Sequence, residues 1–324
     1  MSRRSTAIGA VRAILTAVGV FAATACGSVE NPVAQLPNAT HPDTVVNGKN
    51  RVYISSENQL VIYKYARDYY LGKLTGLQNA KGLCMDAAGD VYATNFSDAD
   101  IFEFIVGQSA PRLINASGPN PVDCAVDPSS GNLAVANEYG KTAYSAGGVA
   151  IYQHAKGTPR IYEYPGFLYF TSCAYDTLGN LLVSGTTTAG EPAFAYLAAG
   201  GKKLESLTLP IDSGWLGPSY VRWDGRYFVA DFIYNTDFLI FVRYALAKQS
   251  GTQIGTTSIR IFAYDSAPFW VGKIGGSPKQ REANALAAAT NGGVYFLKYP
   301  SGTLVYQLRY GIASRGSGIT VSAK

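Results

Sequence analysis

The sequence predicts an all-β fold, a six-bladed β-propeller of four-stranded antiparallel blades. Three observations support this prediction. A phrase made of an apolar run, a tight turn and a second apolar run recurs along the chain, most clearly as CAVDPSSGNLAVAN at residues 124–137. The chain contains 35 Gly and 23 Tyr, residue types that suit tight turns and strands. Long amphipathic helical patterns are scarce after residue 40.

The recurring phrase has the period of a propeller blade. The second residue of the strand that follows each turn is, in order, Tyr53, Tyr92, Ala134, Leu182, Phe228 and Tyr295. The first four gaps are 39, 42, 48 and 46 residues, and a four-stranded blade takes roughly 40–50 residues. The last gap is 67 residues, which we interpret as an insertion carried by one blade.

Each copy supplies the strands of one blade. Asp or Asn followed by Gly favours a tight reversal between the first and second strands. A third strand follows in DIFEFIV and GVAIYQH, and a shorter fourth strand in PRLIN and PRIYEY. One such sheet cannot cover both of its faces, whereas sheets packed around a common axis can. We expect the propeller to span residues 44–324.

Three central copies resemble a known repeat. GLCMDAAGDVYATN, DCAVDPSSGNLAVAN and SCAYDTLGNLLVSG, within about residues 80–190, are similar to the NHL-type propeller repeat. The resemblance implies a six-bladed propeller of the broad superfamily that includes gluconolactonase-like hydrolases and streptogramin lyases. It implies no activity, because this repeat occurs in binding modules and in enzymes.

The N-terminal residues 1–25 have the pattern of a signal peptide. Three Arg precede an apolar run over residues 13–23, and small residues follow before Cys26. ATAC at residues 23–26 resembles the lipobox of bacterial lipoproteins, so we expect Cys26 to be lipidated and to anchor the protein outside the cytoplasm, on the cell membrane or the outer membrane. Secretion with a free Cys26, or an uncleaved anchor, is the alternative.

Charge and hydropathy restrict the partners. The leader holds three of the 27 basic residues, which leaves 24 against 22 acidic residues. A nearly neutral chain without a basic patch argues against nucleic acid. Residues 26–43 are polar and contain Pro, as a flexible tether would. No later stretch is apolar and long enough to span a bilayer, so we expect membrane contact through the N-terminal lipid only, and a monomer.

Loops on one face of the propeller supply the candidate binding site. Loops between second and third strands lie on the same face as loops that lead to the next blade, and function commonly resides on such loops. The candidates are Asn95, Asp98, Asn137, Glu138, Tyr139, Phe167, Tyr169, Trp215, Asp231 and Trp270. Aromatic rings beside amides and carboxylates suit a carbohydrate, a peptide or a partner protein. The alternative is that these rings only pack the loops and blades.

Catalysis has weaker support, and we predict no catalytic residue and no cofactor. Streptogramin lyases use His, but this chain has only His41 in the tether and His154 at the end of a third strand. Gluconolactonase-like enzymes hold a divalent metal with Glu, Asn and Asp from several blades. Asn95, Asn137, Glu138 and Asp231 have these residue types and are the alternative ligands for a cation such as calcium, in a hydrolase or lyase. Loop geometry alone also explains these Asn residues.

Three further segments need an interpretation. Cys84, Cys124 and Cys173 each stand close before the Asp of their copy, and we favour buried free thiols over a Cys124–Cys173 disulfide in an exported protein. Residues 249–257 are expected to form a polar loop. Residues 283–289 (ANALAAA) favour a helix by propensity, but their place before the last turn predicts the first strand of a blade.

Overall fold

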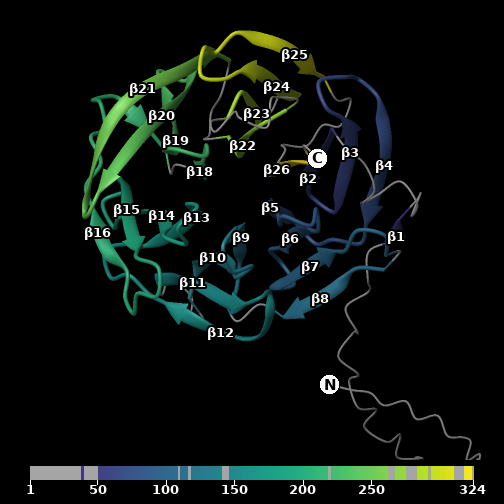
Figure 1. Cartoon of the computed structure of the whole chain (residues 1–324), viewed down its shortest axis with the longest axis horizontal. Coiled ribbons are helices and arrows are strands. Elements are labelled where there is room, and N and C mark those ends of the chain that lie inside the picture. Colours follow the sequence, from purple (N-terminus) through teal and green to yellow (C-terminus); the bar gives the residue numbers. More distant parts are fainter. Residues whose placement is uncertain are drawn as a thin grey trace, which may run out of the picture. The chain divides into compact units, whose positions relative to one another are not determined.

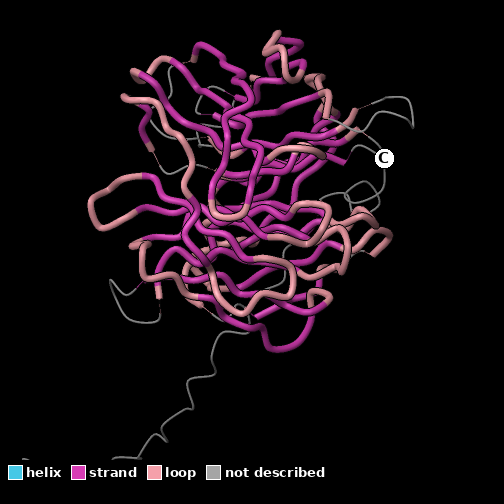
Figure 2. Tube along the Cα trace, turned by 60° about the vertical axis from the view of Figure 1, so that its left-hand side comes forward, coloured by secondary structure: helices cyan, strands magenta, loops and turns pink. Residues whose placement is uncertain are grey.

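The structure of the protein is a computed structural model. It describes residues 38–39, 50–108, 110–115, 118–140, 146–217, 220–261, 267–274, 283–290, 293–309 and 317–322. The regular elements in these residues are strands (Figure 2), and none of them is a helix that could cross a membrane. The predicted signal peptide, the predicted lipidation site Cys26 and His41 lie outside the described residues.

Six antiparallel sheets surround a common axis and confirm the predicted six-bladed β-propeller (Figure 1). Blade 1 consists of β26 (Gly318–Ser322), β2 (Arg51–Ser56), β3 (Gln59–Lys64) and β4 (Tyr70–Thr75). Blade 2 consists of β5 (Ala80–Met85), β6 (Val91–Asn95), β7 (Asp100–Phe104) and β8 (Arg112–Asn115). Blade 3 consists of β9 (Pro121–Val126), β10 (Leu133–Tyr139), β11 (Ala146–Gln153) and β12 (Lys156–Tyr162).

The other three blades repeat this order from the axis outward. Blade 4 consists of β13 (Tyr169–Tyr175), β14 (Leu181–Thr186), β15 (Pro192–Leu197) and β16 (Glu205–Leu207). Blade 5 consists of β18 (Val221–Trp223), β19 (Phe228–Tyr234), β20 (Phe238–Ala247) and β21 (Ser250–Arg260), and β17 (Trp215–Leu216) also pairs with β19. Blade 6 consists of β22 (Phe269–Gly272), β23 (Ala285–Thr290), β24 (Gly293–Lys298) and β25 (Leu304–Leu308).

The ring closes in blade 1, where the two ends of the propeller meet. β26, from the C-terminal end, pairs with β2 and places Ser322 opposite Arg51. Closure of the ring leaves only short, protected strand edges. At the outer edge of the same blade, β1 (Asn38–Ala39) pairs with β4 and places Asn38 opposite Thr75. Two residues of the segment expected to be a tether are therefore part of the sheet.

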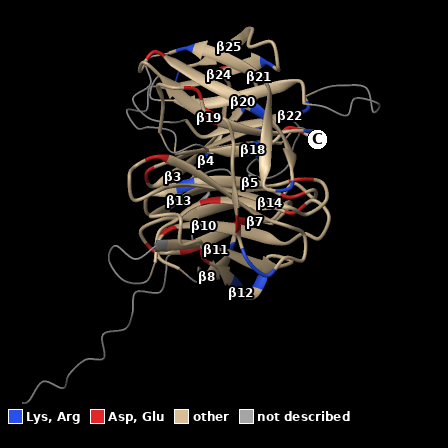
Figure 3. Cartoon of the chain, turned by 90° about the vertical axis from the view of Figure 1, so that its left-hand side faces the viewer, with Lys and Arg blue, Asp and Glu red and all other residues tan. Residues whose placement is uncertain are grey.

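The hydrophobic core lies between neighbouring blades. Between blades 2 and 3, Tyr92 and Ile101 form one buried cluster with Leu133 and Tyr152. Burial of one such side chain is worth about 1.5–3 kcal/mol relative to an exposed position. Both faces of a blade are covered by its neighbours, so consecutive residues of a strand are buried. This explains why apolar runs recur on both sides of the turns. Charged residues of both signs are scattered among a majority of other residues (Figure 3).

Two sequence-based assignments in blades 5 and 6 were wrong. Residues 250–260 form strand β21 instead of a polar loop, because an outermost strand pairs along one edge while alternate side chains face solvent. Residues 285–290 do form a strand, but it is the second of blade 6, after β22. Tyr295 therefore belongs to the third strand of its blade, whereas the other marked residues belong to second strands. This shift by one strand accounts for part of the long last gap.

The expectation of three free thiols was also wrong. Cys84 on β5 and Cys124 on β9 form a disulfide, with their Cα atoms 5.6 Å apart. The alternative partner, Cys173, is buried and free. Cys124 is thus bridged to the cysteine of the preceding blade and not to that of the following blade.

Candidate functional site

In blades 2 to 5, an Asp fixes the turn between the first and second strands. The Asp86 carboxylate accepts the backbone N–H of Ala88 at 2.9 Å, and Asp176 accepts that of Leu178 at 2.8 Å. The same bond occurs in blades 3 and 5. A carboxylate that accepts the N–H two residues later is typical of an Asx-turn. We call the side of the propeller that carries these turns the turn face, and the opposite side, with the predicted site, the loop face.

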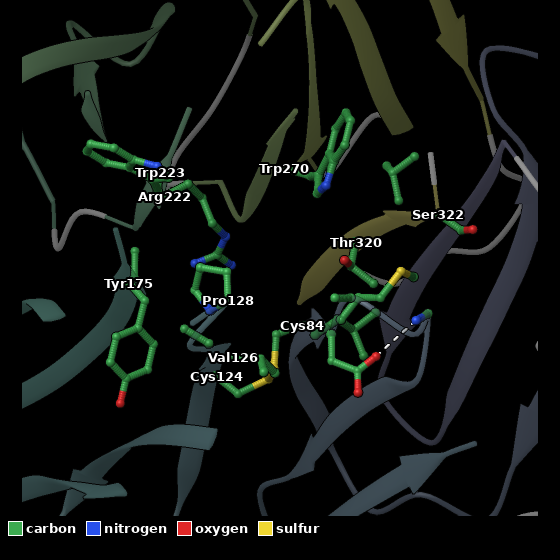
Figure 4. A pocket seen from close by; sticks show the side chains of 18 of the residues that line it. Cys84, Cys124, Val126, Pro128, Tyr175, Arg222, Trp223, Trp270, Thr320 and Ser322 are labelled. Atoms are coloured by element: carbon green, nitrogen blue, oxygen red, sulfur yellow. Dashed lines mark hydrogen bonds between the residues drawn. A yellow bond between two sulfur atoms is a disulfide. The ribbon is translucent and has the colours of Figure 1, made fainter. Parts of the chain in front are cut away.

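A cavity of about 510 Å³ lies at the turn face, among the inner strands (Figure 4). All six blades contribute to its wall. The wall includes Cys84, Met85, Cys124, Val126, Pro128, Tyr175, Arg222, Trp223, Trp270, Thr320 and Ser322. Most of these groups are apolar, and Arg222 is the only cationic side chain among the described residues that line it. An apolar cavity with a few polar groups is the common form of a small-molecule site.

An ion pair between two inner strands fixes the Arg222 side chain. Arg222 Nη1 donates to Asp123 Oδ2 at 2.7 Å and Nη2 donates to Asp123 Oδ1 at 3.1 Å. The Asp123 side chain is fully buried and the Arg222 side chain is 13% exposed. Burial alone would lower the pKa of Arg222, but the charge and hydrogen bonds of Asp123 outweigh burial and raise it. Arg222 therefore stays charged in a rigid position.

Ser172, on the strand between these two, completes the cluster. Its hydroxyl donates to Asp123 and accepts the backbone N–H of Val221 at 3.1 Å. Three successive inner strands are thus joined through side chains. Such a network holds the wall of the cavity in one arrangement.

The disulfide depends on a close approach of β5 and β9. A Cβ atom at Gly82 would lie 2.4 Å from the Cα atom of Asp123, so only Gly permits this spacing. Two residues later, Cys84 reaches Cys124 within the wall. Burial, and next the charge of Asp123, raise the pKa of the remaining thiol, Cys173, well above its ordinary value. Cys173 is therefore a poor nucleophile at neutral pH.

The predicted loop-face residues make several kinds of local contact. The Asn95 amide donates to Asp98 Oδ2 at 2.9 Å and accepts the backbone N–H of Gln78, which is turn chemistry. The rings of Tyr139 and Tyr169 meet edge to face at 5.0 Å. Glu138, the residue before Tyr139 on β10, is half-buried, and burial raises its pKa.

The other predicted aromatic residues have packing roles or different positions. Phe167 is 2% exposed and meets Phe170 edge to face at 5.0 Å, so it cannot contact a ligand. Trp215 packs on Phe232, with ring centres 5.1 Å apart. Trp270 lies on the inner strand β22 and lines the cavity at the turn face, not a loop.

Three of the four alternative cation ligands, Asn95, Asn137 and Asp231, are buried. Asp231 is fully buried and accepts backbone N–H groups from Tyr220 and Ala267. Burial raises its pKa to about 8, and these hydrogen bonds limit the rise. Asn137 is 3% exposed, and its Oδ1 has no partner in the described residues. Within the described ranges, no group of three or more His, Cys, Asp or Glu side chains could hold a metal.

Sequence reasoning missed the residues that shape the cavity. Asp123, Ser172 and Arg222 are polar residues within first strands that are otherwise apolar. Asp123 and Ser172 each stand four residues before the Asp of their turn. A polar residue at one fixed position of an inner strand is a signal that can be found in the sequence.

Comparisons with known proteins show the fold. No family model and no curated protein matches the chain. The chain is similar to the crystal structure of a functionally unknown protein from Desulfotomaculum acetoxidans, with 9% identity and a TM-score of 0.55, over 85% of this chain and 99% of that chain. It is also similar to Kuenenia stuttgartiensis hydrazine synthase, with 10% identity and a TM-score of 0.56, over 90% and 92% of the two chains. Similarity at this level of identity shows the fold and no shared activity.

Proposed function

We propose that the protein is an exported binding protein of the cell envelope that holds a small ligand in the cavity at the turn face. The observation that carries the proposal is the cavity itself, about 510 Å³ in volume and lined by all six blades. This volume falls within the roughly 300–1,000 Å³ that is usual for ligand pockets. A rigid ion pair in the wall supports a preformed site.

Two observations support export. The N-terminal residues have the pattern of a signal peptide that ends before a lipobox-like Cys26. The Cys84–Cys124 disulfide is a bond that persists in oxidising compartments outside the cytoplasm. On this proposal the lipid on Cys26 holds the propeller at the membrane, and the NHL-like repeats serve as a binding scaffold.

The loop face is the weaker place for the ligand. Of the ten candidates there, Trp270 lines the cavity at the turn face, and four are buried: Asn95, Asn137, Phe167 and Asp231. Tyr139 and Tyr169 remain as a half-buried aromatic pair that suits a peptide or carbohydrate. A cation at Asn95, Asn137, Glu138 and Asp231 stays a hypothesis for a hydrolase or lyase.

Titration with the uncharged fluorescent probe N-phenyl-1-naphthylamine tests the proposal. Ala88 is exposed and lines the cavity, and Leu178 is the matched turn residue of blade 4, away from the wall. Ala88→Phe places a ring at the cavity mouth, and overpacking of about 1–3 kcal/mol weakens probe binding roughly 5- to 100-fold. Leu178→Phe should leave binding unchanged.

The expected result is saturable binding of one probe molecule per chain, weakened only by Ala88→Phe. Absence of saturable binding, or equal effects of the two substitutions, would show that the cavity does not hold the ligand. If Tyr139→Ala alone weakened probe binding, the binding site would instead lie at the loop face.

A further inference from the structure

We infer that the cavity selects an uncharged, mainly apolar ligand with a carbonyl-type oxygen, and that Arg222 donates the hydrogen bonds to that oxygen. The inference rests on the proposed binding at this cavity and adds the chemical class of the ligand. It depends on three features of the wall: a donor edge that has no partner among the described residues, a charge balance that disfavours anions, and apolar surroundings.

The first feature is the free edge of the Arg222 guanidinium. Nη1 is occupied by Asp123, by Ser172 and by the carbonyl of Val221 at 2.8 Å, and Nη2 uses one N–H for Asp123. A guanidinium has five N–H groups. The Nε–H and the second N–H of Nη2 therefore have no partner among the described residues. Figure 4 shows the side chain extending from β18 into the cavity.

Trp223 carries a second donor on the same strand. Trp223, the next residue on β18, also lines the cavity, and its buried Nε1 has no partner in the described part of the chain. A buried N–H without an acceptor carries a free-energy cost. An acceptor on a ligand that reached Trp223 Nε1 would remove this cost. The described residues thus leave N–H groups of both Arg222 and Trp223 without an acceptor.

The charge balance of the wall decides between a neutral and an anionic acceptor. The positive charge of Arg222 is already matched by Asp123. The other charged wall residue, Asp86, is negative, and its Oδ1 accepts backbone N–H groups from Ala88, Gly89 and Asp90. An anion that entered would lose hydration without gaining an unmatched cation from the described residues of the wall. A neutral carbonyl oxygen loses less and accepts the same hydrogen bonds.

The other residues of the wall favour a ligand that is mainly apolar. Trp270, Val126, Pro128 and the disulfide present apolar surface around the donors. Apolar area supplies most of the binding free energy in such a site, and the few polar groups supply orientation. A molecule of two or three fused or linked rings matches the cavity of about 510 Å³.

Three naphthalenes of matched size test the inference by displacement of N-phenyl-1-naphthylamine. 2-Acetylnaphthalene carries a neutral carbonyl, 2-isopropenylnaphthalene has the same shape without an acceptor, and 2-naphthoate carries the anion. We expect 2-acetylnaphthalene to displace the probe at concentrations roughly fivefold to tenfold lower than either of the others. Tightest binding of 2-naphthoate, or equal binding of all three, would overturn the inference and leave the proposed function standing. Failure of the probe itself to bind would overturn the proposed function.

Substitutions identify the donor. Arg222→Lys keeps a cation beside Asp123 but removes the free Nε and Nη2 edge, so the preference for the carbonyl should disappear. The matched control is Arg112→Lys, whose arginine pairs with Glu103 away from this cavity. Trp223→Phe keeps the ring and removes the N–H, and it provides a second test if Arg222→Lys does not fold. Retention of the preference in both variants would contradict the assignment.

Discussion

Removal of the Cys84–Cys124 disulfide should lower the free energy of unfolding by about 4 kcal/mol. The bond joins two inner strands across a sequence separation of 40 residues. In the loop-entropy account, a cross-link over that separation removes about 13 cal/mol/K from the unfolded chain, which is about 4 kcal/mol at 25 °C. The perturbation is the double substitution of Cys84 and Cys124 by Ala.

The assay is urea denaturation followed by tryptophan fluorescence, under non-reducing conditions. Cys173→Ala is the matched control, because Cys173 is a buried cysteine on the next inner strand that forms no disulfide. The control reports the loss due to packing alone, and we expect the double variant to lose about 4 kcal/mol beyond the sum of two such losses. Alkylation of the denatured, non-reduced protein should modify Cys173 but neither Cys84 nor Cys124. A loss no greater than the packing loss, or alkylation of all three cysteines, would refute the reasoning.

Three further predictions concern charged groups. Arg222→Met leaves Asp123 buried without its partner, which should cost about 3–5 kcal/mol in urea denaturation, and adding Asp123→Leu should recover much of that loss. Because burial raises the pKa of Asp231 to about 8, the folded state keeps a proton that the unfolded chain releases above about pH 4. Stability should therefore fall as pH rises from about 4 to 8, and Asp231→Asn should flatten that part of the profile when unfolding is measured across pH. Calcium should leave the melting temperature unchanged, because the oxygens of Asn95 and Asp231 already accept backbone N–H groups.

Each of these predictions has a contradictory outcome. Equal stability of the single and double ion-pair variants would show that the buried charge of Asp123 is not the source of the loss. A pH profile that is the same with Asp231→Asn would assign the pH dependence to other groups. A rise in melting temperature with calcium that is lost in Glu138→Gln would favour the metal-dependent alternative.

The fold could be predicted from the sequence because its signals are local. The carboxylates of Asp86 and Asp176 accept backbone N–H groups of their own turns. Each turn can therefore be recognised from a few consecutive residues. The last blade was misaligned for the same reason. The sequence NGGVYFL resembles the earlier phrases, but its strand β24 is the third strand of its blade and pairs with the second strand, β23. A turn phrase alone does not specify which pair of strands it connects.

The candidate site was less accessible to sequence reasoning because it depends on contacts between blades. Arg222 and Asp123 are 99 residues apart in the chain and meet only when inner strands surround one axis. Trp270 was placed on a loop because the flanking residues are rich in Gly and polar groups, whereas its own strand has only four residues. The disulfide depends on the close approach of β5 and β9 at Gly82. The spacing of the cysteines in the sequence does not reveal this approach.

A crystal structure of the protein with 2-acetylnaphthalene tests the central claim most directly. The account predicts difference density in the cavity at the turn face, with the ketone oxygen within hydrogen-bond distance of Nε or Nη2 of Arg222. Density over Tyr139 and Tyr169 at the loop face, with the cavity at the turn face occupied by solvent alone, would contradict it.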